Sequence, residues 1–214
     1  MELELGEHGW LISYPPLMTI LEQLMGTSFA FHHLHSDRHD SGCTHKNWHH
    51  DYEQYPQSNR SHAMVHVFHY LNGLDGAIAD LVVVPRTQYE VMDKRALDCF
   101  GVDTLPHEIA INNLPAGTTV IAHSAIFHAR RAKPFSVGKV PPRYFIDCSY
   151  CQVGVRWPQV KPYWRGMLAK ARELKLDRGT WKDLFDEKHF YDPFEILPQF
   201  DQINQGSLIE KLIA

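Results

Sequence analysis

The chain has 214 residues, enough for one domain with a substantial hydrophobic core. Its formal net charge of −4 offers no basic surface for nucleic acid, and no apolar stretch approaches the length of a membrane span. The acidic start lacks the features of a secretory signal, and four cysteines in a chain of this length do not predict a disulfide scaffold. We therefore expect a cytoplasmic globular protein with neither a nucleic acid nor a membrane as its partner.

The N-terminal part predicts a short helix followed by a strand. Pro15 and Pro16 open the segment LMTILEQLM and Gly26 ends it, because proline fits the first turn of a helix and glycine favours the residue after the last. The segment SFAFHHLH alternates as a strand does, and SDRHDSGCTHKN is typical of a loop. The apolar spacing in the helix predicts a buried face made of Leu17, Ile20, Leu21, Leu24 and Met25.

The middle of the chain predicts strands and both ends predict helices. A short helix is expected at 90–101, and two more at 164–176 and 180–191. Strands at short intervals with Gly- and Pro-containing turns are typical of an antiparallel sandwich or barrel. We therefore expect a mainly β fold and one domain over residues 1–214. The expected strands are HAMVHVFHYLNG (62–73), IADLVVVP (78–85), EIAIN (108–112), TTVIAHSAIFH (118–128) and RYFIDCSYCQVGV (143–155).

Two histidines and an aspartate stand together in the stretch KNWHHDYEQYP, residues 46–56. If this stretch is extended, His49 and Asp51 point to one face and His50 points away. An imidazole and a carboxylate on one face are two thirds of the two-histidine, one-carboxylate triad that binds iron(II) and leaves coordination positions open. The third ligand must come from elsewhere in the chain.

The best candidate for this third ligand is His128, at the end of the expected strand 118–128. His123 is the alternative on the same strand. Since the two are five residues apart, they should point to opposite faces, so only one of them can serve. We favour His128 because a strand end would lie at the mouth of a barrel.

An arginine begins the next expected strand. The guanidinium of Arg143 offers a rigid fork for a carboxylate, which an iron(II) oxygenase needs for the distal carboxylate of 2-oxoglutarate. The loop 132–142 would join strands 118–128 and 143–151 as an antiparallel hairpin and place Arg143 beside the His128 end. Arg130 is a second candidate for cofactor binding. Together with Arg131 it would otherwise suit an acidic substrate or be solvated.

The motifs WHHDY, DLVVVP, GTTVIAHSAIFHARR and PRYFIDCSYCQ, in this order, resemble the phytanoyl-CoA dioxygenase family over about residues 10–157. The resemblance implies a double-stranded β-helix, or jelly-roll (cupin-like), core at about 27–157, followed by a helical extension at 158–214. It implies iron ligands His49, Asp51 and His128, and Arg143 as the 2-oxoglutarate clamp. Family members usually carry a further N-terminal segment, which we expect this chain to lack.

The resemblance also implies an activity. The chain would be an Fe(II)- and 2-oxoglutarate-dependent dioxygenase that uses O2 to hydroxylate a small organic substrate while 2-oxoglutarate is decarboxylated to succinate. In related halogenases a small residue replaces the carboxylate ligand, so Asp51 favours hydroxylation. The family acts on acyl thioesters, amino-acid-like solutes and secondary metabolites, and an anionic substrate would suit the arginine pair and the histidine-rich loop.

Other interpretations remain open. A jelly-roll protein lacking part of the family fold can keep a metal site as a catalytically inactive metal-binding or ligand-binding module. A zinc hydrolase could use the same ligands, although no additional glutamate base stands nearby in sequence. Cys148 and Cys151 could form half a zinc site or a redox pair, but in a strand they would face opposite ways. An open strand edge could pair with a second copy as a homodimer.

Histidines are concentrated near the start of the chain, where seven of the fifteen precede residue 51. Histidine is the commonest metal ligand, but a polar loop rich in histidine is the simpler interpretation for most of them. We therefore expect most of these side chains to be solvated. The seven are His32, His33, His35, His39, His45, His49 and His50.

Overall fold

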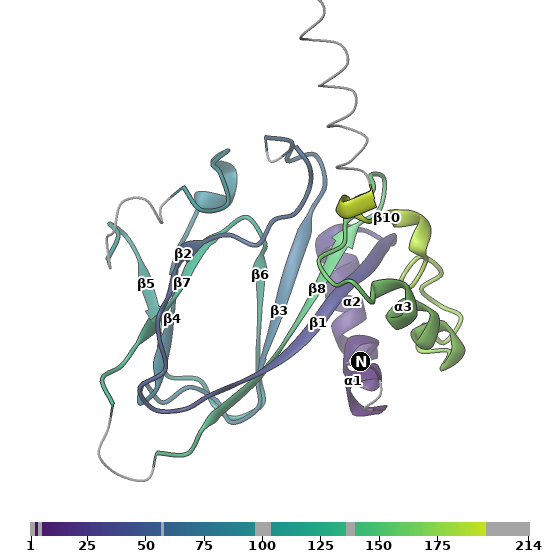
Figure 1. Ribbon diagram of the computed structural model, residues 1–214. Helices are drawn as coiled ribbons and strands as arrows, with labels where there is room; N and C mark the ends of the chain where they lie inside the picture. The colour runs from purple at the N-terminus through teal and green to yellow at the C-terminus, as the bar shows by residue number, and fades with distance from the viewer. Residues whose placement is uncertain (1–2, 4–5, 57, 97–103, 136–139, 196–214) are drawn as a thin grey trace, which may run out of the picture.

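Two four-stranded sheets face each other in the computed structural model (Figure 1), which describes residues 3, 6–56, 58–96, 104–135 and 140–195. The larger sheet has the order β1 (Phe29–His39), β8 (Arg143–Gln152), β3 (Met64–Tyr70), β6 (Thr118–His123). The smaller sheet has the order β2 (Lys46–His49), β7 (Phe127–Ala132), β4 (Ala79–Val84), β5 (Ile109–Ile111). Neighbouring strands in both sheets are antiparallel. The predicted mainly β, jelly-roll fold class is confirmed.

Helix α2 runs from Pro15 to Met25, as the sequence predicted. Gly26 follows it with φ of +85°, a backbone conformation that glycine adopts without strain, and its N–H donates to the carbonyl of Glu22. The predicted buried face is partly wrong, because Ile20 and Leu24 are 45% and 55% exposed. The buried face of α2 consists of Leu17, Met18, Leu21 and Met25. The apolar side chains thus cover a wider part of the helix surface than the part that packs against the sheet.

The difference between the buried and exposed leucines of α2 gives a matched pair of substitutions. Leu21 is fully buried in the main core, and Leu21→Ala should lower the free energy of unfolding by about 3 kcal/mol because it removes buried methyl groups and leaves a cavity. Leu24→Ala should change it by less than about 0.5 kcal/mol because Leu24 is largely in water. Urea denaturation of both variants checks the pair, and equal losses would contradict the orientation of α2.

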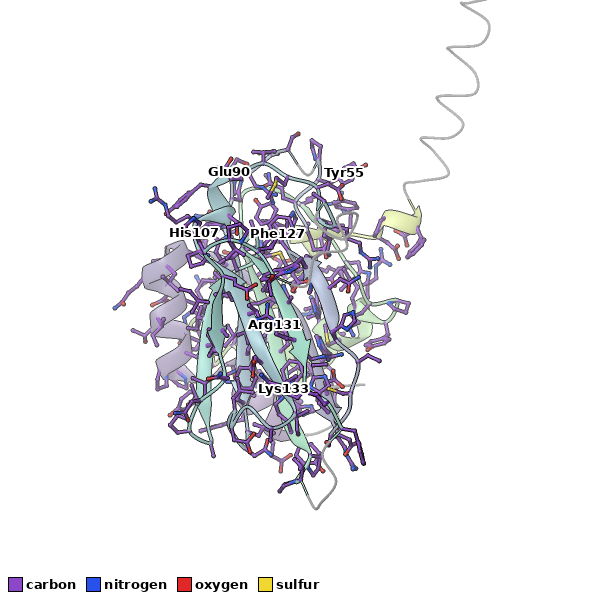
Figure 2. The ribbon with its side chains drawn as sticks, turned by 90° about the vertical axis from the view of Figure 1, so that its left-hand side faces the viewer. Tyr55, Glu90, His107, Phe127, Arg131 and Lys133 are labelled. Atoms are coloured by element: carbon purple, nitrogen blue, oxygen red, sulfur yellow. The ribbon has the colours of Figure 1, made fainter. Side chains whose placement is uncertain are left out.

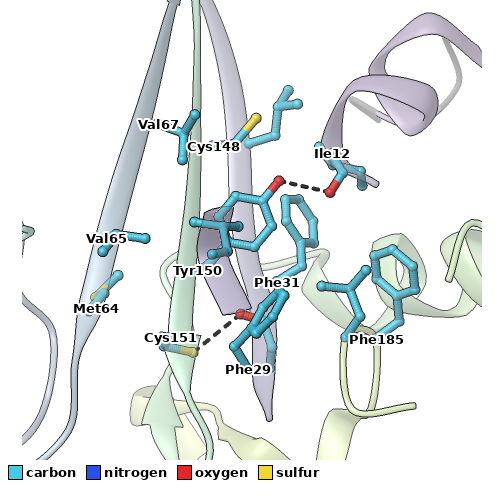
Figure 3. Packing of buried hydrophobic residues seen from close by; sticks show 14 of the residues in the cluster. Ile12, Phe29, Phe31, Met64, Val65, Val67, Cys148, Tyr150, Cys151 and Phe185 are labelled. Carbon is cyan, nitrogen blue, oxygen red and sulfur yellow. Dashed lines mark hydrogen bonds between the residues drawn. The ribbon is translucent and has the colours of Figure 1, made fainter. Parts of the chain in front are cut away.

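The main core lies between the larger sheet and the helices on its outer face (Figure 1). These helices are α1 (Gly6–Ile12), which the sequence did not predict, α2, and α3 (Trp164–Glu173). Aromatic side chains of β1 and β8 fill the centre of this layer (Figure 3). The hydroxyl of Tyr150 donates to the carbonyl of Ile12 at 2.8 Å, which joins α1 to β8. Packing the helices on this face leaves the inner face of the sheet for a site.

The C-terminal extension contains less helix than predicted. Helix α3 is present, but residues 180–191 form turns, a 3-10 helix η4 (Glu187–His189) and strand β10 (Phe190–Tyr191). Strand β10 pairs in parallel with β9 (Trp157–Pro158), because fully buried Phe190 belongs to the core that Trp157 also fills. Residues 196–214 of the expected extension lie outside the described residues.

The helix predicted at 90–101 is also wrong where the structure describes it. Residues 90–96 form a bend, a short irregular segment and a turn, and the rest of the prediction lies outside the described residues. The side chain of Asp93 accepts from the N–H of Arg95, a local bond that competes with helix formation. None of the described helices has the length and apolar composition needed to cross a bilayer.

Candidate metal centre

The expected strand 118–128 is two strands that belong to different sheets. Strand β6 ends at His123 in the larger sheet, and β7 begins at Phe127 in the smaller sheet. Between them the ring of His123 accepts from the N–H of Ala125 at 3.1 Å and closes a tight turn. The prediction that His123 and His128 share one strand is therefore wrong. After the turn, His128 lies on the smaller sheet and lines the pocket, whereas His123 belongs to the larger sheet.

The three predicted metal ligands lie together. Strands β2 and β7 place His49 directly opposite His128, with ring centroids 4.3 Å apart. Asp51 follows β2, and its carboxylate oxygens lie 3.6 Å from Nε2 of His49 and 3.2 Å from Nε2 of His128. The backbone N–H of Asp51 donates to the carbonyl of Ser124 at 2.8 Å, which ties the ligand segment to the turn before β7. His50 points elsewhere, with its Nε2 3.1 Å from the carbonyl of Met92.

Both imidazoles are oriented in the same way by the backbone. Nδ1 of His49 lies 2.7 Å from the carbonyl of Asn47, and Nδ1 of His128 lies 3.2 Å from the carbonyl of Ile126. If each Nδ1 carries the proton and donates it there, both Nε2 lone pairs face Asp51. Nε2 of His49 is buried and has no hydrogen-bond partner among the described residues. An orphaned buried nitrogen beside a carboxylate fits a bound cation.

The protonation states also fit a metal. Burial, followed by the neighbouring charge of His128, lowers the pKa of His49 to about 3, so its ring is neutral at physiological pH. Burial alone would raise the pKa of Asp51, but the charge and hydrogen bond of His128 outweigh it and hold that pKa well below the ordinary value. A neutral imidazole and an ionised carboxylate are the forms that bind a divalent ion.

Arg143 lines the same pocket, although the predicted hairpin is wrong. Strand β8 pairs with β1 and β3 in the larger sheet, whereas His128 lies on β7 in the smaller one. The guanidinium is buried, donates from Nη1 to the carbonyl of Ala79 at 2.7 Å, and lies 2.8 Å through Nη2 from Nδ1 of His39. Its Nε has no partner, and no described carboxylate forms an ion pair with it. A buried cation in this state fits an anionic ligand.

The other two arginines are engaged locally. Nε of Arg130 donates to the carbonyl of Thr44 at 3.1 Å, and its Nη1 lies 3.9 Å from Asp37. Arg130 therefore lines the pocket, but its guanidinium already has an acidic partner. Arg131 forms an ion pair with Glu108 at 2.6 Å. Figure 2 shows Arg131 with Lys133 along the smaller sheet, which faces the reader. Of these three arginines, Arg143 is the one without an ion pair among the described residues.

A charged pair lies on the inner face of the larger sheet. Nδ1 of His66 is 2.9 and 3.0 Å from the two carboxylate oxygens of Asp147, and both side chains are 5% exposed. Burial favours the neutral ring, but the charge of Asp147 outweighs it and raises the pKa of His66 to about 9. Because Asp147 lines the pocket with Phe68 and Tyr70, this face of β3 is the one turned to the site.

The pair predicts a stability that depends on pH. The folded pKa of His66, about 9, lies above the ordinary value of 6.5, so its contribution is fully present below pH 6.5 and is lost as the pH rises through 9. We expect the free energy of unfolding of the metal-free protein to fall by roughly 3 kcal/mol over that interval. Asp147→Asn should remove most of this fall, and urea denaturation at stepped pH measures it. Parallel curves for the two proteins would contradict the pairing.

The expectation that most of the early histidines are solvated is wrong. Strand β1 continues through residues 36–39, where a loop was predicted, because it pairs with β8 as far as Arg143. A bulge between Phe31 and His33 shifts the register there, and His35 then stands opposite Asp147. His35 is partly buried and His45 is exposed. The buried ones are His32, His33, His39, His49 and His50.

Two further groups of close side chains could hold a metal among the described residues, and no cysteine belongs to any of the groups. One consists of His33, His35 and Asp147, and the other of Asp183, Asp186 and His189. Cys148 and Cys151 are buried in the main core, and burial raises the pKa of both thiols well above the ordinary value. This environment disfavours the thiolate that zinc binding or redox chemistry requires.

No family model matches this chain, and no curated protein matches its sequence. Solved structures share its fold. The non-heme alpha-ketoglutarate-dependent epimerase SnoN from nogalamycin biosynthesis is 15% identical with a TM-score of 0.55, over 70% of this chain and 59% of SnoN. HygX from Streptomyces hygroscopicus with iron bound is 12% identical with a TM-score of 0.57, over 74% and 73%. The non-heme monooxygenase ThoJ in a nickel complex is 14% identical with a TM-score of 0.51, over 67% and 52%.

These similarities establish the class of fold. The chain spans less than two thirds of SnoN and of ThoJ, and at 12–15% identity the likeness is one of architecture. HygX is also solved with nickel and 2-oxoglutarate, and SnoN with Fe3+, alpha-ketoglutarate and nogalamycin RO. The described chain thus shares the jelly-roll fold of SnoN and HygX, with a His-Asp-His group in its pocket.

Proposed function

We propose that this protein is an iron(II)- and 2-oxoglutarate-dependent dioxygenase that hydroxylates a small organic substrate with O2. The observation that carries the proposal is the convergence of His49, Asp51 and His128 in a pocket that also contains the unpaired guanidinium of Arg143. The bound iron and 2-oxoglutarate of HygX and SnoN support the same cofactors here. Three protein ligands leave coordination positions open for cosubstrate and oxygen.

Each residue has a task that follows from its contacts. His49 and His128 would hold iron(II) through Nε2, with their rings fixed by the carbonyls of Asn47 and Ile126, and Asp51 supplies the charged oxygen. When bound, iron and 2-oxoglutarate supply the activation of O2 for oxidation of the substrate. Arg143 would bind the distal carboxylate of 2-oxoglutarate and thereby set its orientation. The remaining pocket wall includes apolar side chains that exclude water, among them Phe68, Leu81 and Phe145.

The finer assignment rests on sequence motifs. WHHDY and GTTVIAHSAIFHARR support membership of a phytanoyl-CoA dioxygenase-like group within this fold. SnoN is an epimerase and ThoJ a monooxygenase, so the fold serves more than one outcome. Hydroxylation rather than halogenation is the outcome that we propose for this chain, because Asp51 keeps a carboxylate at the position that halogenases leave open.

Turnover of 2-oxoglutarate tests the proposal. Purified protein with iron(II), O2 and 2-oxoglutarate should form succinate above a metal-free control, and zinc(II) should not replace iron(II). The alternative is a catalytically inactive jelly-roll module. Such a module would bind iron and form no succinate, and this result would overturn the assignment as an oxygenase. Activity with zinc(II) in a hydrolysis assay would instead support a metallohydrolase.

A further inference from the structure

Two of the three metal-ligand candidates, His49 and Asp51, line two pockets. The inner pocket contains Arg143 and the aromatic side chains described above. His49 and Asp51 also line a second, more open pocket, here called the outer pocket. Its remaining wall consists of His45, Asn47, Lys94 and Arg95, together with Lys46, which also lines the inner pocket. A ligand in the outer pocket would therefore approach the metal ligands from a side that the cosubstrate carboxylate at Arg143 does not use.

The outer pocket is cationic. Lys46, Lys94 and Arg95 line it, and its acidic member, Asp51, belongs to the metal-ligand group. Lys94 is paired with Glu53, but neither Lys46 nor Arg95 has an acidic partner within the described part of the chain. The chain as a whole carries a net charge of −4, so this local excess of positive charge has the opposite sign to the charge of the whole protein. It creates an attractive potential for anions beside His49 and Asp51.

The cationic wall is built into the same elements as the ligands. Lys46 opens β2, three residues before His49, and stands opposite Arg130 in the ladder with β7. The segment with Lys94 and Arg95 is attached directly, because the N–H of His50 donates to the carbonyl of Lys94 at 3.1 Å. The positive groups are thus held at a fixed place relative to His49 and Asp51, and an anion bound there would be positioned against the metal site.

We infer that the outer pocket receives the substrate, and that the substrate carries an oxyanion, a carboxylate or a phosphate, which Lys46 and Arg95 bind. This inference rests on the proposed function, since it names the substrate class of the same site. Arg130 and Arg131 are less suited to bind an acidic substrate, because they already pair with Asp37 and Glu108. The anionic group holds one end of the substrate while the rest reaches the metal.

Paramagnetic relaxation tests the inference without knowledge of the substrate. The protein is loaded anaerobically with Mn(II) and saturating 2-oxoglutarate, and the relaxation rates of 31P in inorganic phosphate and of 13C in labelled acetate are measured. We expect enhanced relaxation of one or both anions, and their relative affinities distinguish a phosphate from a carboxylate substrate. The double variant Lys46→Glu/Arg95→Glu should weaken anion binding by at least roughly tenfold, because charge reversal replaces attraction by repulsion.

A matched control carries the same change in net charge elsewhere. Arg178→Glu/Lys182→Glu alters two exposed cations of the C-terminal region, which do not line either pocket, and should leave the relaxation unchanged. Equal relaxation in Lys46→Glu/Arg95→Glu and wild type, or none in a wild type that binds Mn(II) and 2-oxoglutarate, would overturn the inference and leave the proposed function standing. If no metal binds, the proposed function fails. In that case, calorimetric titration of phosphate and acetate into the metal-free wild type and variants tests whether the outer pocket binds anions independently of the metal.

Discussion

Replacing His128 with alanine is expected to abolish iron(II) binding, which an anaerobic titration would show as loss of the weak visible charge-transfer band of the iron–2-oxoglutarate complex. Nε2 of His128 lies 3.2 Å from the Asp51 carboxylate and faces the orphaned Nε2 of His49. Changes to groups that only support a ligand already cost about 10- to 100-fold in metal affinity, so removal of a ligand should cost at least about 100-fold. Succinate formation should fall to the level of the metal-free control.

His123→Ala is the matched control, because the sequence alone leaves His123 as the rival ligand. In the structure its ring stacks on Tyr52 and accepts from the N–H of Ala125, and it belongs to none of the metal-capable groups. This variant should keep the band, with at most about a tenfold change in iron affinity, since it acts only through the turn before β7. Loss of the band in His123→Ala together with its retention in His128→Ala would refute the proposed ligand set.

Features that depend on neighbours in sequence could be predicted closely. Pro15 and Gly26 define both ends of α2. Two-residue alternation located β3, and strand-like segments bounded by turn residues located β4 and β8, all to within a few residues. The alternation also placed His49 and Asp51 on one side with His50 on the other, because that relation is local to three residues. The juxtaposition of these residues with His128 followed from the order of motifs, not from any local rule.

Features that depend on pairing between distant strands could not be predicted in this way. The predicted strand is interrupted at Ser124 and Ala125 without glycine or proline, so no strong turn signal marked the point where the chain leaves the larger sheet. The register shift after Phe31 likewise has no local signal, yet it decides which side chains of β1 face the interior. The hairpin predicted for Arg143 was wrong, while its place in the pocket follows from β8 lying between β1 and β3.

Replacing Arg143 with alanine is expected to raise the 2-oxoglutarate requirement by about 100-fold and to leave iron(II) affinity nearly unchanged. Arg143 is 6% exposed and has no carboxylate partner among the described residues, so the distal carboxylate of 2-oxoglutarate would be its counter-charge. Truncating one side of a buried, hydrogen-bonded charge pair costs a few kcal/mol, and about 3 kcal/mol corresponds to roughly 100-fold. The dependence of the charge-transfer band and of succinate formation on 2-oxoglutarate measures the effect.

Two comparisons separate a clamp from a structural role of Arg143. Arg143→Lys keeps the charge but loses the planar fork, so it should recover only part of the affinity. Arg130→Ala should change the requirement by less than about tenfold, because Arg130 already donates to Thr44 and lies near Asp37. Saturating 2-oxoglutarate, at 100 times its Kd, should stabilise the iron-loaded wild type by about 2.7 kcal/mol. At the same concentration it should stabilise Arg143→Ala far less. An Arg143→Ala protein that is less stable, yet responds to 2-oxoglutarate as the wild type does, would show that this guanidinium only supports the fold through Ala79 and His39.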